Sequence, residues 1–169
     1  MTSVLVAYAT KYGSTREVAE RVAERLRERG LVTDLRAAGE ARSLDGYDAV
    51  IFGGALYMFR LIREGRRFLS RHAKRLAGLP VAVFAMGPTE QSDQQFLDAR
   101  RHLDRTLVKL KGVSPVAITI FGGAFDPAKL KFPYANAGTR AMPPADLRDW
   151  RAIEAWADSL PDKLVAKTV

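Results

Sequence analysis

Residues 8–15 read YATKYGST and join the apolar run Val4–Ala7 to a helical pattern that begins at Ser14. The apolar run is unbroken by charge, as expected for a strand that is covered on both faces. The helical pattern covers residues 14–29, with apolar side chains at four-residue steps (Val18, Val22, Leu26), and Gly30 follows where a helix C-terminal glycine belongs. A strand that leads through a short loop directly into a helix indicates an α/β fold.

The loop between strand and helix is rich in hydrogen-bond donors. Thr10, Ser14 and Thr15 supply hydroxyls, and Gly13 lets the chain turn. The start of a helix carries partial positive charge and free N–H groups, so this loop predicts a binding site for an anion such as phosphate. The alternative interpretation is a capping box, in which Ser14 and Glu17 do no more than satisfy the helix terminus. The local sequence is compatible with both.

Strands and helices alternate along the rest of the chain. Further strands are expected at residues 31–35, 49–52, 81–86 and 116–121, and further helices at 60–76, 93–110 and from Trp150 to Leu160. This alternation implies βαβ crossovers and predicts a single domain over residues 1–169, with a doubly wound, five-stranded parallel sheet and helices on both faces. Residues 124–145 contain half of the prolines and are expected to form an irregular loop, of the kind that is often functional. Trp150 and Trp156 are predicted to anchor the last helix in the core.

Composition excludes several classes of function. The chain has no cysteine, which rules out disulfides, thiolate metal sites and thiol nucleophiles. Its two histidines, His72 and His102, lie in basic helical runs and are expected at the surface, so no metal site is predicted. No apolar run approaches the ~18 residues of a membrane span and no signal peptide is recognised, so we expect a soluble, cytoplasmic protein. The net charge of +8 predicts attraction to an anionic partner.

Familiar phosphate-binding motifs are missing from the sequence. GxxxxGK[ST] is absent, which argues against a Walker-type nucleotide hydrolase, and no GxGxxG follows the first strand. The first strand ends in Ala7-Tyr8-Ala9, without the carboxylates that a phospho-accepting receiver domain needs for magnesium.

The segment Thr10–Thr15 resembles the flavodoxin phosphate loop, [ST]-x-T-G-x-T, with Tyr12 in place of the second threonine. Gly53–Tyr57 after the third strand and Gly87–Glu90 after the fourth extend the resemblance in order and spacing. It is closer still to the branch of the flavodoxin superfamily that includes menaquinone-dependent protoporphyrinogen dehydrogenases. That branch shares the YATKYGST opening, Phe121-Gly122-Gly123-Ala124 and Asp149-Trp150. The resemblance implies a flavodoxin-like sheet of order 2-1-3-4-5 that binds FMN beyond strands one, three and four.

On this resemblance the cofactor is FMN, with a related flavin or a deazaflavin as the alternative. The residues expected to bind it are Thr10, Lys11, Tyr12, Gly13, Ser14, Thr15, Gly54, Ala55, Leu56, Tyr57, Met58, Gly87, Pro88, Thr89 and Glu90. Ser14 and Thr15 would hold the phosphate, and Gly87–Glu90 would meet the polar edge of the ring. Tyr57 would stack on the isoalloxazine, unless it packs beneath the loop as an ordinary core aromatic. No catalytic residue is predicted.

Two functions remain open at this point. One is an FMN-dependent oxidoreductase that passes electrons from a reduced organic substrate, such as a porphyrinogen, to a quinone. The other is a non-catalytic electron carrier between redox proteins. The basic helix Arg60–Arg75 either is a solvated face or docks on something anionic: a membrane surface, a substrate carboxylate or an acidic redox partner. No nucleic-acid recognition module is visible, so nucleic acid is not an expected partner.

Overall fold

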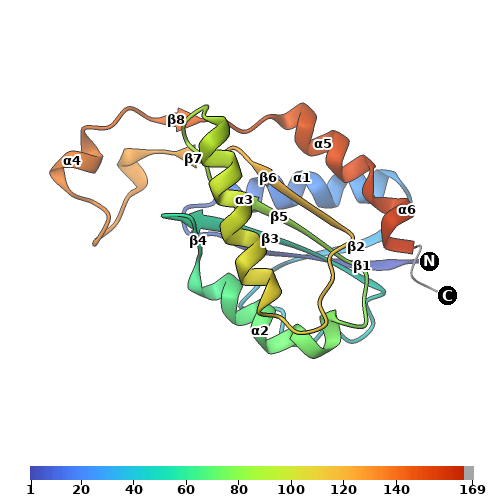
Figure 1. The fold of residues 1–169 in the computed structure, drawn as a ribbon. Coiled ribbons are helices and arrows are strands. Elements are labelled where there is room, and N and C mark those ends of the chain that lie inside the picture. Colours follow the sequence, from blue (N-terminus) through green and yellow to red (C-terminus); the bar gives the residue numbers. More distant parts are fainter. Residues whose placement is uncertain (166–169) are drawn as a thin grey trace.

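Five parallel strands form the predicted sheet in the predicted order (Figure 1). The computed structural model describes residues 1–165. The sheet order is β2-β1-β3-β5-β6, and these strands are β1 (Ser3–Ala9), β2 (Val32–Ala37), β3 (Ala49–Tyr57), β5 (Val81–Met86) and β6 (Ala117–Phe121). The expected doubly wound α/β fold is therefore confirmed. A sixth strand that the sequence did not predict, β4 (Arg60–Leu61), pairs antiparallel with the end of β3.

Helices cover both faces of the sheet and create two hydrophobic cores. One face carries α1 (Ser14–Glu28), α5 (Trp150–Asp158) and α6 (Leu160–Val165), and the other carries α2 (Arg63–Leu76) and α3 (Asp93–Val108) (Figure 1). Successive strand residues point to opposite faces. In β1, Val4 and Val6 pack under α1 whereas Leu5 and Ala7 pack over α2, and all four are fully buried. Burial on both faces explains why this strand is apolar throughout.

The second predicted helix begins three residues later than expected. The chain turns at Met58 and Phe59, both with positive φ, and Arg60–Leu61 then runs back along Leu56–Tyr57 as β4. The helix α2 starts only after this hairpin, at Arg63. The glycines at the end of β3 serve the packing, because a Cβ at Gly54 would collide with Leu61 of the hairpin.

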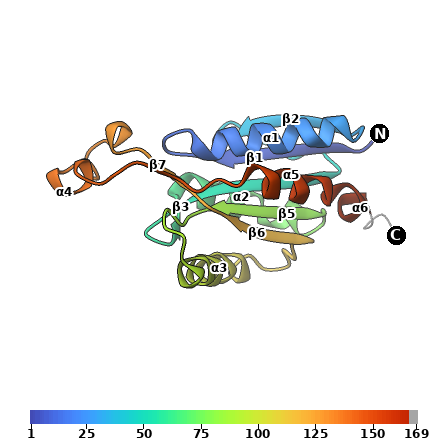
Figure 2. The ribbon, with the colours of Figure 1, turned by 90° about the horizontal axis from the view of Figure 1, so that it is seen from above.

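Residues 124–145, predicted to be an irregular loop, contain short regular elements. They are β7 (Ala124–Phe125), a 3₁₀ turn η1 (Pro127–Lys129), α4 (Ala137–Arg140) and the first residue of β8 (Ala145–Asp146). The strands β7 and β8 pair antiparallel, and the segment between them projects beyond the carboxyl end of the sheet (Figure 2). This projecting segment, residues 124–146, lies at the end of the sheet where the sequence predicted ligand binding.

Two predictions about single side chains are wrong. His72 is buried instead of exposed, because it faces the sheet one helical turn after Phe68, and its Nε2 lies 2.9 Å from the carbonyl oxygen of Ala41. Trp150 is 38% exposed and lies against Arg148, so it is not a core anchor. Trp156 does pack against the core, with its ring 5.8 Å from that of Phe84.

Candidate functional site

The loop after β1 ends in a helix terminus that no side chain caps. Gly13 is the N-cap residue of α1, with φ at +96°, a conformation that glycine adopts readily. Ser14 is already the first helical residue, and the first helical hydrogen bond runs from Glu17 N–H to Gly13 C=O at 3.2 Å. The capping-box interpretation of Ser14 and Glu17 is therefore wrong. The N–H groups at the helix start precede the helical ladder and remain available to an anion.

Thr15 adds a hydroxyl that has no hydrogen-bond partner in the described part of the chain. Its side chain is fully buried, and Oγ1 makes no hydrogen bond within residues 1–165. A buried hydroxyl without a partner costs roughly 1–3 kcal/mol, so a group that supplies the missing acceptor is expected. The donor set at this helix start, hydroxyls plus N–H groups, suits a phosphate well.

A cavity of about 260 Å³ adjoins this loop at the carboxyl ends of β1, β3 and β5. Ten of the residues that the sequence predicted to bind the cofactor line it: Thr10, Lys11, Tyr12, Ser14, Ala55, Leu56, Tyr57, Met58, Gly87 and Thr89. Three loops that are far apart in the sequence therefore meet around one space. Their binding of a ligand remains a prediction.

The other five predicted residues lie outside this lining. Gly13 makes the turn and Thr15 lies buried below it. Gly54 serves the packing of β3. Pro88 is buried, and its C=O accepts from Gly123 N–H at 2.7 Å. Glu90 is exposed and accepts a hydrogen bond from Gln95.

The projecting segment supplies site residues that sequence reasoning missed. The additional lining residues are Met86, Gly123, Ala124, Phe125, Leu130, Tyr134 and Thr139, and all but the first lie between residues 123 and 139. The backbone N–H of Lys131 donates to the Tyr12 hydroxyl at 3.4 Å, which ties the segment to the first loop. The available signal was the length and proline content of the segment, but neither property says which side chains turn inward.

Three tyrosines gather around Lys11 at the centre of the site. The Tyr57 ring lies 6.0 Å from that of Tyr12 and 5.6 Å from that of Tyr134. Lys11 Nζ lies 3.8 Å from the centre of the Tyr134 ring and 5.3 Å from that of Tyr57, within cation–π range. Burial raises the pKa of the Tyr57 phenol above its ordinary value, so this group stays protonated at neutral pH.

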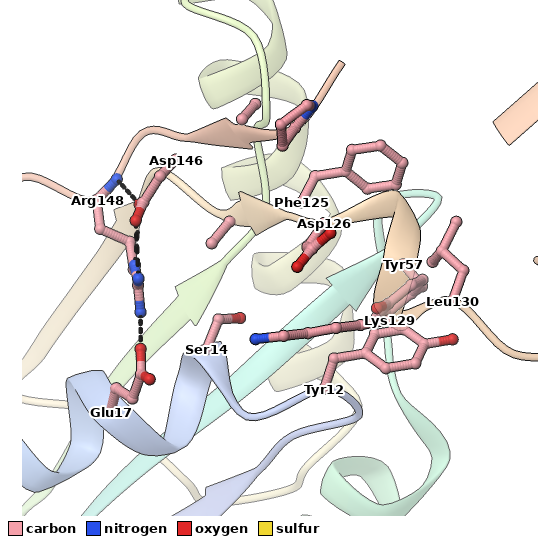
Figure 3. Close-up of a pocket in the computed structure, with 13 residues that line it drawn as sticks. Tyr12, Ser14, Glu17, Tyr57, Phe125, Asp126, Lys129, Leu130, Asp146 and Arg148 are labelled. Carbon is pink, nitrogen blue, oxygen red and sulfur yellow. Dashed lines mark hydrogen bonds and ion pairs between the residues drawn. The ribbon is translucent and has the colours of Figure 1, made fainter. Parts of the chain in front are cut away.

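A second cavity, of about 380 Å³, continues from the first toward the start of α1 (Figure 3). Lys129 of η1 points toward Ser14 there and brings a positive charge to the helix start. Arg148 forms ion pairs with Glu17 and, at 2.8 Å, with Asp146. The hydrogen bond from Arg148 lowers the pKa of Asp146, and the two carboxylates raise the pKa of the guanidinium. These pairs fasten β8 to α1 at the edge of the site.

Known proteins resemble this chain in sequence and in fold. The flavodoxin domain family matches residues 5–135. A curated relative, protoporphyrinogen IX dehydrogenase [quinone] of Escherichia coli K12, is 27% identical over 106 residues, which cover 59% of each chain. The alignment thus spans less than two thirds of that relative. Flavodoxin 2 of Bacillus cereus has a TM-score of 0.60 at 19% identity, and a cysteine-to-serine mutant of Pseudomonas aeruginosa flavodoxin has 0.62 at 18%; each comparison covers 96% of this chain and 99% of the other. At this identity the two structures show the fold alone.

Proposed function

Because the chain belongs to the flavodoxin domain family, which indicates a flavin cofactor, we propose that it binds FMN and acts as an oxidoreductase. Its substrate on this proposal is a reduced organic molecule of the porphyrinogen kind, and its electron acceptor is a quinone. The name of the Escherichia coli relative supports this substrate and acceptor. FMN is preferred over a related flavin or a deazaflavin because of the family.

The observation that carries the proposal is the buried, unpartnered hydroxyl of Thr15 at an uncapped helix start. Thr15, Ser14 and the N–H groups that open α1 would hold the FMN phosphate, with Lys129 as a nearby counter-charge. Since the phosphate is charged, a hydrogen bond from Thr15 to it is worth about 1.5–3 kcal/mol. The same bond would offset the free-energy cost of burying the Thr15 hydroxyl without a partner.

The remaining lining of the two cavities suits an aromatic ring with one polar edge. Tyr57 offers its ring face and Met58 lies next to it, while the backbone near Gly87 offers polar groups. A bound flavin supplies reversible uptake of two electrons, and the protein's residues hold and orient it. The projecting segment contributes part of the lining of the site.

Each turnover would remove two electrons and two protons from the substrate, and the quinone would take up two electrons and two protons to become a quinol. The alternative function is electron transfer between redox proteins, the role of an ordinary flavodoxin. The net charge of +8 favours the enzyme. Flavodoxins that act as electron carriers are typically acidic and dock on basic partners, and a basic chain does not suit that role. No helix within residues 1–165 is long and apolar enough to cross a membrane.

We also propose that the exposed basic face of α2 meets an anionic membrane surface. Met58 and Phe132, which are 89% and 92% exposed, lie on the hairpin and on the projecting segment at the same end of the molecule. Apolar tips beside a basic helix suit a lipid surface, from which a lipid-soluble quinone would reach the site.

The test combines binding with turnover. Apo-protein is titrated with FMN while flavin fluorescence is followed, and then the loaded protein is given protoporphyrinogen and a menaquinone analogue. Quenching at micromolar FMN together with quinone-dependent porphyrin formation is the expected result. Quenching without turnover, combined with rapid electron exchange with redox proteins, would favour the carrier. No quenching would contradict the cofactor assignment.

A further inference from the structure

A third cavity, of about 470 Å³, lies where β4 leads into α2. Four cationic side chains line it, Lys11, Arg60, Arg63 and Arg66, together with the apolar residues Leu61 and Ile62. It shares Thr10, Lys11, Tyr57 and Tyr134 with the candidate flavin cavity, so the two spaces have a common wall. In Figure 1, β4 and the start of α2 lie at the same end of the sheet as the projecting segment.

Among the described residues, no carboxylate forms an ion pair with the cations of this cavity. On α1 and at its C-terminal end, by contrast, ion pairs with Asp or Glu of α1 or α5 are formed by Arg16, Arg21, Arg25 and Arg29. No ion pair involves the cations of β4 and α2 within the described part of the chain. The carboxylate that lines the cavity, Glu64, accepts a hydrogen bond from Gly39 N–H at 2.9 Å. Four positive side chains therefore line this cavity together with one negative side chain, an arrangement that attracts an anion.

The side chain of Arg66 also indicates an anion site, for a reason separate from the number of cations. Its side chain is half-buried, and its Nε is buried without a hydrogen-bond partner among residues 1–165. A buried donor of a charged group is costly to leave unsatisfied. The guanidinium presents a planar fork of donors that matches the two oxygens of a carboxylate.

The mixed lining indicates what kind of anion fits. Leu61, Ile62 and the Tyr57 ring are apolar, so the ligand presents hydrocarbon next to its charge. The helix start of α1, which is the expected place for the FMN phosphate, belongs to the other two cavities. We propose that the cavity at β4 and α2 binds a carboxylate of the organic substrate and thereby holds the substrate beside the flavin site. The identity of the substrate rests on the proposed function, whereas the recognition of a carboxylate does not.

Two variants, each of which loses three positive charges, test this assignment. The first changes Arg60, Arg63 and Arg66, here called the anchor arginines, to glutamine. The second changes Arg67, Arg71 and Lys74, here called the outer cations, to glutamine; they are exposed on α2 and do not line the cavity. Binding of protoporphyrin IX, a dicarboxylate, and of its dimethyl ester is measured by equilibrium dialysis, with and without FMN and at fixed ionic strength.

We expect the wild type to bind the dicarboxylate at least about tenfold more tightly than the ester, a difference of about 1.4 kcal/mol. Loss of the anchor arginines removes this preference, and loss of the outer cations leaves most of it. Because Arg66 is half-buried, the double variant Arg60→Gln/Arg63→Gln, at exposed positions, is measured too and is expected to lose part of the preference.

Several results would overturn the assignment. They are equal binding of acid and ester by the wild type, no binding of either, and equal loss in the two triple variants. Displacement of the dicarboxylate by inorganic phosphate, but not by propionate, would make the cavity a phosphate site. Failure to bind FMN, with the preference for carboxylate intact, would contradict the proposed function and leave this inference standing.

Discussion

Replacing Thr15 with valine separates a ligand-binding hydroxyl from a structural one. Valine has nearly the shape of threonine, so the substitution removes the hydroxyl and leaves the packing in place. Thr15 Oγ1 is fully buried and has no partner in the described structure. The unfolded chain hydrates this hydroxyl, whereas the folded protein does not, so its burial opposes folding by roughly 1–3 kcal/mol.

The substitution is therefore expected to act in opposite directions on stability and on binding. The free energy of unfolding of FMN-free protein rises by roughly 1–3 kcal/mol, because the cost of burying the hydroxyl is removed. FMN affinity falls by about 1.5–3 kcal/mol, which is about 10- to 150-fold, because a hydrogen bond to a charged phosphate is lost. Riboflavin has the same ring but no phosphate, so its affinity stays close to that of the wild type.

Urea unfolding of the apo-protein gives the first quantity, and titration by flavin fluorescence gives the other two. The matched control is Thr106→Val on α3, where Oγ1 donates to the carbonyl oxygen of His102 at 3.1 Å, far from the site. This control leaves both affinities unchanged. If Thr15→Val destabilises the apo-protein and weakens FMN and riboflavin equally, Thr15 supports the helix and does not contact phosphate.

Four further predictions follow from the site and its surroundings. Tyr57→Leu is expected to weaken FMN and riboflavin alike, by about 2- to 10-fold, because a stacked ring is worth about 0.5–1.5 kcal/mol; unchanged titrations would place Tyr57 in the packing instead. Lys129→Gln is expected to reduce FMN affinity by up to about fivefold at low salt and to leave riboflavin unaffected, as for an exposed ion pair; an equal effect on riboflavin would argue against a phosphate contact. Changing the outer cations to glutamine should abolish sedimentation with acidic vesicles and leave FMN affinity unchanged, because each cation contributes about 1 kcal/mol of attraction to an anionic membrane. If the wild-type protein does not sediment with such vesicles at low salt, the membrane proposal is wrong. Asp146 should titrate by NMR below the ordinary aspartate pKa and return toward it in Arg148→Gln. Since its folded pKa is depressed, its stabilising contribution is present above the ordinary value and is lost as pH falls through the folded one.

The sequence alone was sufficient for the alternation of strands and helices because that feature depends on local periodicity, whereas the order of the strands was implied by the resemblance to flavodoxins. An apolar run such as Val4–Ala7 cannot be solvated on either face, so it must form a central strand between helices. The four-residue repeat in residues 14–29 likewise produces one apolar helix face, and this face is fully buried at Val18, Val22 and Leu26. Periodicity did not determine where each helix begins. The sequence predicted that the second helix starts at Arg60, but α2 starts at Arg63 because a hairpin precedes it.

Part of the candidate site could also be predicted, because it lies at the edge where the parallel strands end. The loops after β1, β3 and β5 meet because parallel strands end at one edge of the sheet, so Thr10, Tyr57 and Gly87 could be grouped from the pattern alone. Whether Ser14 capped the helix could not be decided that way. The answer depended on the backbone of Gly13, which takes the N-cap position and leaves Ser14 inside the first turn.

The tertiary structure decided what closes the site and which charges stand beside it. Lys131 lies 119 residues from Tyr12 in the chain but contacts its hydroxyl, and Tyr134 stacks on Lys11. A repeating sequence pattern cannot predict contacts of this kind, because they depend on how the projecting segment packs against the loop after β1. Local sequence likewise predicts a basic helix in α2, but not that Arg66 lines a cavity while its buried Nε has no hydrogen-bond partner among residues 1–165. Periodicity determines which face of an element is buried, whereas the packing of distant segments determines which polar groups are left without partners and are free to bind a ligand.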